Sequence, residues 1–246
     1  MASRIPHIVL QTAEALAEDA AQRFARAASD AVQSHGEFVV ALSGGATPRA
    51  LYARLAAPPY LSSVPWSLVR VLWGDERCVA PDQAASNYRM AREALLDHVP
   101  IRAENVHRIR GEDVPAEAAR AYERTLRTVL REARIDLMLL GLGEDGHTAS
   151  LFPGAVDVPD GEPWVVARYH VAGSLWRVTL TPLVINAAAE VLFLVSGAGK
   201  AAIVHRVLEG PRRPQELPAQ LIAPADGRML WLLDAAAARD LEGRGC

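Results

Sequence analysis

A glycine-rich segment carries the residues of this chain that are best suited to acid–base chemistry. It reads GLGEDGHTASLFPG over Gly141–Gly154 and follows the apolar run Ile135–Leu140, so a buried strand is expected to end there. Glycine permits tight turns and a close approach of the backbone to a ligand. Asp145 and His147 place a carboxylate and an imidazole two residues apart on this turn. The pair suits proton transfer, because an imidazole titrates near neutral pH.

The same glycines imitate a dinucleotide-binding motif. Gly141, Gly143 and Gly146 match G-x-G-x-x-G. That motif requires a long helix directly after the glycines and an acidic residue about 20 positions further on. Pro153 and Gly154 interrupt any such helix almost at once. The segment therefore does not predict a nicotinamide cofactor.

A second glycine-rich turn follows the apolar run Phe38–Leu42 and reads SGGATP. Its candidate binding residues are Ser43, Gly44, Gly45 and Thr47. Backbone N–H groups at such a turn, together with the N-terminus of the following helix, can hold a phosphate. The alternative is a tight turn in which Thr47 only caps the helix.

Two further strand ends carry charge. Asp75, Glu76 and Arg77 follow the apolar run Leu68–Trp73. A carboxylate there could bind sugar hydroxyls or transfer a proton, and the arginine could hold an anion; the alternative is an ion pair between Glu76 and Arg77. Lys200, the one lysine of the chain, follows a glycine-rich turn. It could reach a phosphate as a point charge or lie on the surface.

Composition argues against several classes of protein. The chain has 246 residues, 50% of them apolar, and a net charge of -3 without long blocks of like charge. Nucleic-acid binding and membrane-surface binding therefore have no support, and no apolar run reaches the roughly 20 residues of a membrane helix. Cys78 and Cys246 share no metal or redox spacing, and acidic residues soon after Ile8–Leu10 do not suit a signal peptide. These features predict a cytoplasmic protein.

Apolar runs and helix signals alternate along the chain. The expected strands are Ile5–Leu10, Phe38–Leu42, Leu68–Trp73, Val106–Ile109, Ile135–Leu140, Trp164–Tyr169, Arg177–Leu180, Val191–Val195 and Met229–Leu233. The expected helices include one capped by Thr12 and ended by Gly36, one opened by Pro115, and a short Ala-rich one after the last strand. This alternation predicts an α/β fold with a doubly wound, mainly parallel sheet and helices on both faces. The loop Ala155–Pro163 is too short to divide domains, so residues 1–246 are expected to form a single domain.

Several motifs together resemble those of one enzyme family. Three of them are the segments already described, Gly141–Gly154, Ser43–Pro48 and WGDER at Trp73–Arg77. The others are SNY at Ser86–Tyr88, RVTLT at Arg177–Thr181 and VSGAGKA at Val195–Ala201. In this order and spacing they resemble the 6-phosphogluconolactonases, a Rossmann-like α/β family similar in fold to glucosamine-6-phosphate isomerase/deaminase. The resemblance runs from about Leu42 to the LWLLD segment Leu230–Asp234. It departs at Tyr169–Trp176, where the lactonases usually have a Lys-Pro-Pro-Pro-like loop.

The resemblance implies hydrolysis of 6-phospho-D-glucono-1,5-lactone to 6-phospho-D-gluconate, in the oxidative pentose phosphate pathway and without a cofactor. His147 would act as the general base, and Asp145 would orient its imidazole. Asp75 would either join the chemistry or bind sugar hydroxyls. The residues expected to hold the phosphate are Ser43, Gly44, Gly45, Thr47, Lys200 and an arginine, which is Arg77, Arg168 or Arg177.

Two other functions stay open. A glucosamine-6-phosphate deaminase would be similar, but those enzymes carry a glutamate where this chain has Ser150–Pro153. A non-enzymatic sugar-phosphate sensor would normally add a DNA-binding helix-turn-helix. The expected partner is the small sugar-phosphate lactone, with no nucleic acid and no membrane, and the chain is expected to be a monomer or a homodimer. The histidines other than His147 show no ligand spacing, so no metal is expected.

Overall fold

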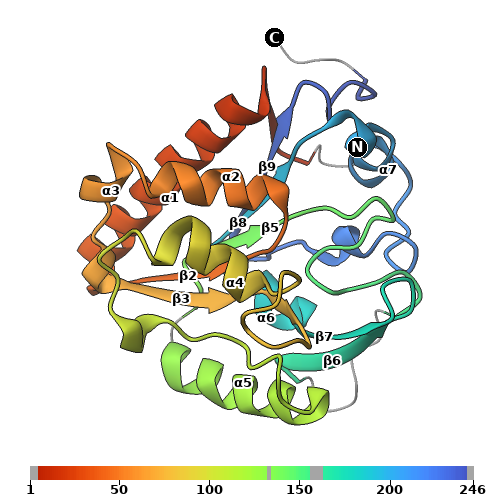
Figure 1. Ribbon diagram of the computed structural model, residues 1–246. Coiled ribbons are helices and arrows are strands. Elements are labelled where there is room, and N and C mark those ends of the chain that lie inside the picture. Colours follow the sequence, from red (N-terminus) through yellow and green to blue (C-terminus); the bar gives the residue numbers. More distant parts are fainter. Residues whose placement is uncertain (1–4, 132–133, 156–162, 243–246) are drawn as a thin grey trace.

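The computed structural model describes residues 5–131, 134–155 and 163–242 (Figure 1). Most of the expected loop Ala155–Pro163, and Cys246, lie outside these ranges. The larger sheet of the described residues is parallel throughout. In spatial order its six strands are β1 (His7–Leu10), β9 (Arg228–Asp234), β8 (Glu190–Val195), β5 (Leu137–Leu140), β2 (Phe38–Leu42) and β3 (Val69–Trp73).

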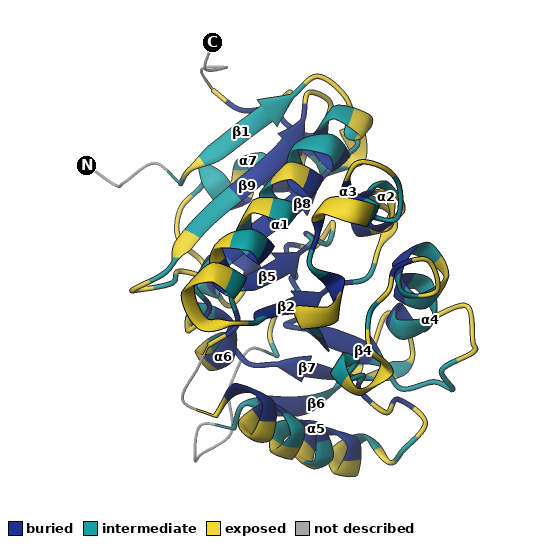
Figure 2. Ribbon diagram, turned by 90° about the vertical axis from the view of Figure 1, so that its left-hand side faces the viewer, coloured by how far each residue is buried: buried dark blue, intermediate teal, exposed yellow. Residues whose placement is uncertain are grey.

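Helices cover both faces of this sheet, as the sequence predicted. The central strands β2 and β5 are buried at every residue, which explains their continuous apolar sequences. Helices α1 (Ala13–His35) and α2 (Ala46–Leu55) pack on one face, and α7 (Ala201–Leu208) lies on the other (Figure 2). The bounds of α1 confirm its predicted signals, because Thr12 accepts a hydrogen bond from the Ala15 N–H and Gly36 ends the helix with a φ of 88°.

The order of the strands creates a crevice between β5 and β2. The chain passes from β2 to β3 in one direction across the sheet, and from β5 to β8 in the opposite direction. Loops at the carboxyl ends of β2 and β5 therefore diverge to opposite faces. Ligands of such sheets bind at this position.

A smaller antiparallel sheet lies beside the large one. Its strands are β4 (Asp75–Arg77), β7 (Leu175–Leu180) and β6 (Val165–His170), and α5 (Pro115–Leu130) packs against it. The sequence analysis did not separate β6 and β7 from the parallel sheet. The four residues 171–174 that join them can close a hairpin, whereas a parallel crossover needs about a dozen residues or more.

Two expected elements are wrong. Val106–Ile109 is not a strand, because only Val106 pairs, in an isolated bridge to Val71. The Ala-rich segment after β9 forms turns, in which the Asp234 carboxylate accepts the Ala237 N–H. Alanine propensity alone does not sustain so short a helix.

The remaining elements are short, and none of the helices in the described ranges has both the length and the apolar character needed to cross a bilayer. They are α3 (Tyr60–Ser63), α4 (Asn87–Ala91), α6 (Pro182–Asn186), a π-helical turn at Arg92–Leu96, and 3-10 turns at Trp66–Leu68, Ala103–Asn105, Ala198–Lys200 and Pro218–Leu221.

Candidate active site

A pocket of about 390 Å³ opens at the carboxyl ends of β2, β5 and β8, with β4 and β7 on its far side. The structure brings together nearly all of the residues that the sequence singled out. Those that line the pocket are Ser43, Gly44, Gly45, Thr47, Asp75, Arg77, His147, Arg177 and Lys200. Asp145 joins the group through its contact with His147. Arg168 is not part of the lining.

His147 and Asp145 lie in direct contact at the edge of the pocket. The Nδ1 atom of His147 lies 2.6 Å from Asp145 Oδ1, and the His147 backbone N–H donates to the same oxygen at 3.1 Å. Burial alone would raise the pKa of Asp145, but the backbone hydrogen bond and the His147 ring hold that pKa below its ordinary value. An ionised carboxylate at Nδ1 favours a proton on that nitrogen. The other nitrogen, Nε2, is then free to accept one.

Gly143 makes room for this pair. A Cβ atom at this position would lie 2.0 Å from His147 Nδ1 and 2.7 Å from Asp145 Oδ1. Both distances are too short for any side chain. A hydrogen bond from the Gly143 N–H to the His147 carbonyl at 2.8 Å closes the turn. The imidazole occupies the space that a side chain at this glycine would fill.

Replacement of Gly143 with alanine is expected to displace the imidazole from Asp145, and any reaction in which this imidazole transfers a proton should slow by about tenfold or more, since small misplacements of reacting groups are costly. The matched control is Gly199→Ala, because the nearest atom to a Cβ there is Glu144 Oε1 at an ordinary 3.7 Å. Steady-state rates and thermal unfolding of both variants check this. Equal rates in a folded Gly143→Ala protein would contradict the crowding argument.

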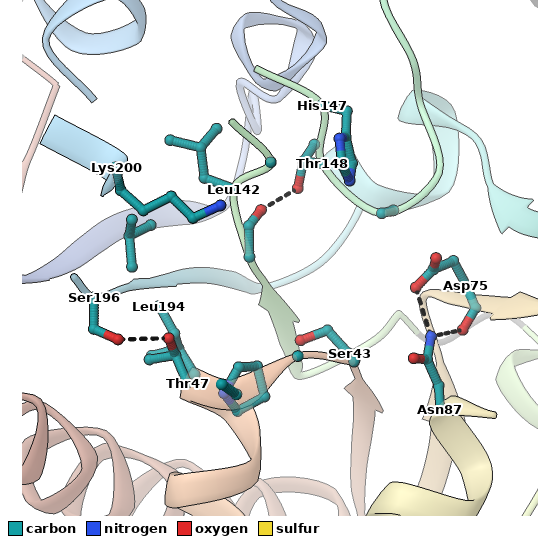
Figure 3. Close-up of a pocket in the computed structure, with 18 of the residues that line it drawn as sticks. Ser43, Thr47, Asp75, Asn87, Leu142, His147, Thr148, Leu194, Ser196 and Lys200 are labelled. Carbon is teal, nitrogen blue, oxygen red and sulfur yellow. Dashed lines mark hydrogen bonds between the residues drawn. The ribbon is translucent and has the colours of Figure 1, made fainter. Parts of the chain in front are cut away.

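The opposite side of the pocket has the features of an anion site (Figure 3). Gly45 is the N-cap of α2, so unpaired N–H groups of the first helical turn lie at the pocket. Thr47 does not cap the helix with its side chain, because its Oγ1 lies 2.7 Å from Ser196 Oγ and joins the first turn of α2 to the loop that follows β8. Ser43 Oγ is buried and has no hydrogen-bond partner among the described residues. A ligand oxygen would satisfy it.

Lys200 brings a positive charge to this side. Its side chain extends past Leu142 into the pocket from the turn after β8, on the side of Thr47 and Ser196 (Figure 3). Within the described ranges no ion pair involves Lys200. The charge is therefore available to a ligand.

Asp75 lies across the pocket from Lys200 (Figure 3), and its carboxylate accepts a hydrogen bond at each oxygen. The Asn87 side-chain amide donates to Oδ1 at 3.1 Å, and the Ser150 hydroxyl donates to Oδ2 at 2.6 Å. All three residues are buried. This carboxylate is fixed in place and still presents lone pairs to a ligand.

Glu76 is a structural residue rather than half of an ion pair with Arg77. Its carboxylate accepts the backbone N–H groups of Arg77, Asn87 and Tyr88 at 2.7–2.8 Å and the Ser86 hydroxyl at 3.0 Å. Burial raises the pKa of Glu76, against the opposite effect of these backbone hydrogen bonds. Glu76 thereby ties the start of α4 to β4 and places Asn87 beside Asp75.

Three arginines lie in register across the small sheet. Arg77 on β4 is opposite Arg177 on β7, which is opposite Arg168 on β6. Burial lowers the pKa of Arg177, and the charge of Arg77 lowers it further, while Asp75 acts in the other direction. Like charges on facing positions destabilise a sheet. An anion beside Arg77 and Arg177 would relieve this repulsion.

The sequence analysis missed several residues of the site. Asn87, Thr148 and Ser196 line the pocket; Asn87 belongs to a motif quoted only for its resemblance, and Thr148 and Ser196 belong to glycine-rich segments in which other residues were singled out. The signal was therefore present, but the role of Asn87 and Ser196 depends on partners at Asp75 and Thr47, which are distant in sequence.

Comparisons with known proteins agree with these motifs. The family model described as glucosamine-6-phosphate isomerases/6-phosphogluconolactonase matches residues 11–231. A 6-phosphogluconolactonase of Aggregatibacter actinomycetemcomitans is 35% identical over 233 residues, which is 95% of this chain and 98% of that protein. One from Nostoc sp. is 42% identical over 219 residues, or 86% of this chain and 88% of that protein.

Solved structures give the same result. The 6-phosphogluconolactonase from Trypanosoma cruzi superimposes with a TM-score of 0.84 at 28% identity, covering 98% of both chains. A monomeric glucosamine-6-phosphate deaminase has a TM-score of 0.81 at 22% identity, covering 96% of this chain and 100% of its own. The second likeness concerns the fold alone.

Proposed function

Since the chain belongs to the glucosamine-6-phosphate isomerase/6-phosphogluconolactonase family, we propose that it hydrolyses 6-phospho-D-glucono-1,5-lactone to 6-phospho-D-gluconate with His147 as the general base. The reaction belongs to the pentose phosphate pathway. The single observation that carries the mechanism is the 2.6 Å contact between His147 Nδ1 and Asp145, on the edge of a pocket that also holds Lys200.

The chemical step needs little more than this pair. A lactone is an activated ester, so the protein must activate water and hold the ring. Nε2 of His147 takes a proton from a water molecule that attacks C1, and the imidazolium returns it to the ring oxygen as the C1–O bond breaks. Asp145 stabilises the cation in between. A positioned base of this kind contributes roughly 10²–10⁴-fold.

The phosphate is assigned to the side of the pocket that contains Lys200. The N-terminus of α2 at Gly44 and Gly45, the hydroxyls of Ser43 and Thr47, and the ammonium of Lys200 supply donors of the right kind. Binding at this remote end orients the carbonyl at the other end of the sugar. The guanidinium groups of Arg77 and Arg177 are the arginine candidates, because both line the pocket.

Asp75 is assigned to a sugar hydroxyl. Its two oxygens already accept hydrogen bonds from Asn87 and Ser150, so it is arranged as an acceptor. A hydroxyl of the ring can donate to the lone pairs that remain.

The deaminase alternative has less support. Those enzymes carry a glutamate after the histidine motif, and this chain has Ser150–Pro153 there. Ser150 is buried and bonded to Asp75, and Phe152 is buried beside His147. Neither side chain could replace a carboxylate.

A side-by-side assay tests the function. Purified protein is given freshly made 6-phosphogluconolactone in one reaction and glucosamine 6-phosphate in the other. Acid release well above the spontaneous rate from the first, without ammonia from the second, is the expected result. Ammonia release would move the chain to the deaminases, and neither activity would return it to the sensor hypothesis.

Dialysis against a strong chelator is expected to leave the rate unchanged. The described residues contain no group of three or more His, Cys, Asp or Glu side chains that could hold a metal ion, and the proposed chemistry uses only protein groups. Rates before and after dialysis check this. Activity that is lost and then returns with a divalent ion would contradict it.

We also propose a cytoplasmic setting, which Cys78 supports as a free cysteine.

A further inference from the structure

Three aromatic rings extend from His147 to the hairpin of β6 and β7. The rings of His147 and Phe152 have centroids 5.0 Å apart, with 54° between their planes. Phe152 in turn stacks on His170, with centroids 4.2 Å apart and only 11° between planes. Phe152 is buried, and His170 is the last residue of β6. The rings of His147 and His170 are themselves 6.4 Å apart, so the hairpin approaches His147 both directly and through Phe152.

The position of the His170 ring depends on packing. Its Nδ1 atom is buried and has no hydrogen-bond partner in the described part of the chain. A Cβ atom at Gly173, in the hairpin turn, would lie 2.6 Å from that nitrogen, so a glycine is needed for the ring to fold back. Burial lowers the pKa of His170, the charges of Arg177 and His147 lower it further, and Asp145 has the opposite effect. A neutral imidazole suits face-to-face contact with phenylalanine.

We propose that His170 is a positioning residue for the hydrolysis, which fixes the His147 imidazole by holding Phe152 against it. This inference rests on the proposed function. It concerns the segment Tyr169–Trp176, where this chain departs from the usual loop of the lactonases.

The need for such a support follows from the torsions of histidine. The terminal torsion of an imidazole side chain has broad wells, so the hydrogen bond at Nδ1 leaves the ring free to rock about that contact. Phe152 packs against the ring and restricts this motion. The Phe152 ring also lies 5.9 Å from the Arg177 guanidinium. A shift of this ring would therefore disturb the surroundings of Arg177 as well as those of His147.

Three variants of His170 and one control test the proposal. His170→Ala removes the stack, His170→Leu fills the space without a flat ring, and His170→Phe keeps a flat ring. The control is Tyr169→Ala, which removes the neighbouring ring on the opposite side of the same strand. That ring is 47% exposed and pairs with Trp176 instead. Each protein is assayed for kcat and KM, and the His147 ring signal is followed by NMR.

The alanine and leucine variants are expected to lose about tenfold in kcat, with KM changed by less than about twofold because the phosphate ligands remain. In both, the His147 signal shifts, because the His170 ring 6.4 Å away is lost and the ring of Phe152 moves. His170→Phe and Tyr169→Ala are expected to keep the wild-type kcat and the wild-type signal.

A folded His170→Ala or His170→Leu protein with wild-type kcat or an unshifted His147 signal would overturn the proposal. So would an equal loss in Tyr169→Ala, because stability of the hairpin would then be the cause, or a failure of His170→Phe to restore kcat. The leucine variant decides the question if the alanine variant does not fold. If wild-type protein hydrolyses no lactone, the proposed function fails, and the His147 signal alone decides about the stack.

Discussion

Replacement of His147 with alanine is expected to lower kcat/KM for 6-phosphogluconolactone at least about a hundredfold, since a positioned general base is worth roughly 10²–10⁴-fold. The fold should survive. The side chain is 29% exposed, and the turn is closed by the backbone hydrogen bond from the Gly143 N–H to the His147 carbonyl, which alanine retains. Acid release is measured at fixed pH with the spontaneous rate subtracted, and circular dichroism reports the fold.

The matched control is His205→Ala, which removes a half-exposed histidine on α7 that pairs with Glu209 outside the pocket. It is expected to keep the wild-type rate. A folded His147→Ala protein with near-wild-type turnover would remove His147 from the mechanism, and the base would have to be sought elsewhere in the pocket.

Replacement of Lys200 with methionine is expected to lower kcat/KM for the phosphorylated lactone by about 2–3 kcal/mol, the size of a lost hydrogen bond to a charged group. Methionine keeps most of the length of the side chain and removes its charge. Hydrolysis of unphosphorylated gluconolactone, already poor, should barely change, because that substrate has no group for Lys200 to hold. Both substrates are measured on wild type and variant.

Arg206→Met provides the control for charge, since Arg206 is an exposed cation on α7 that does not line the pocket. It should affect neither substrate. Equal losses on the two lactones in Lys200→Met would mean that Lys200 supports the structure or the chemical step, and the phosphate would then have to be assigned to another part of the pocket.

The parallel sheet could be predicted because its signals are local. A strand such as Phe38–Leu42 is apolar at every position and is followed by a glycine-rich turn and a helix. The antiparallel arrangement of β6 and β7 could not be predicted in the same way. Their apolar runs look like those of the parallel strands, and only the short turn between them distinguishes the pairing. The Ala-rich segment after β9 shows the converse, in that strong local propensity did not produce a helix.

The candidate site could be predicted where function depends on a residue's own chemistry and its place at a strand end. His147, Asp145 and Lys200 were found in this way, and the structure places them at one pocket. Roles that depend on a distant partner could not be found. Glu76 looked like a charged site residue, yet it accepts four hydrogen bonds, from Arg77, Ser86, Asn87 and Tyr88. The stacking of His170 on Phe152 likewise needs the hairpin to fold back.

The central claim is that the two ends of the substrate lie at two sides of one pocket, with the phosphate at Lys200 and C1 at His147. A crystal structure with the product 6-phosphogluconate tests this most directly. The account predicts the phosphate at the N-terminus of α2, within hydrogen-bond distance of Lys200 Nζ, and the C1 carboxylate beside His147 Nε2. The reverse orientation, or a phosphate held by Arg77 and Arg177 away from Lys200, would contradict it.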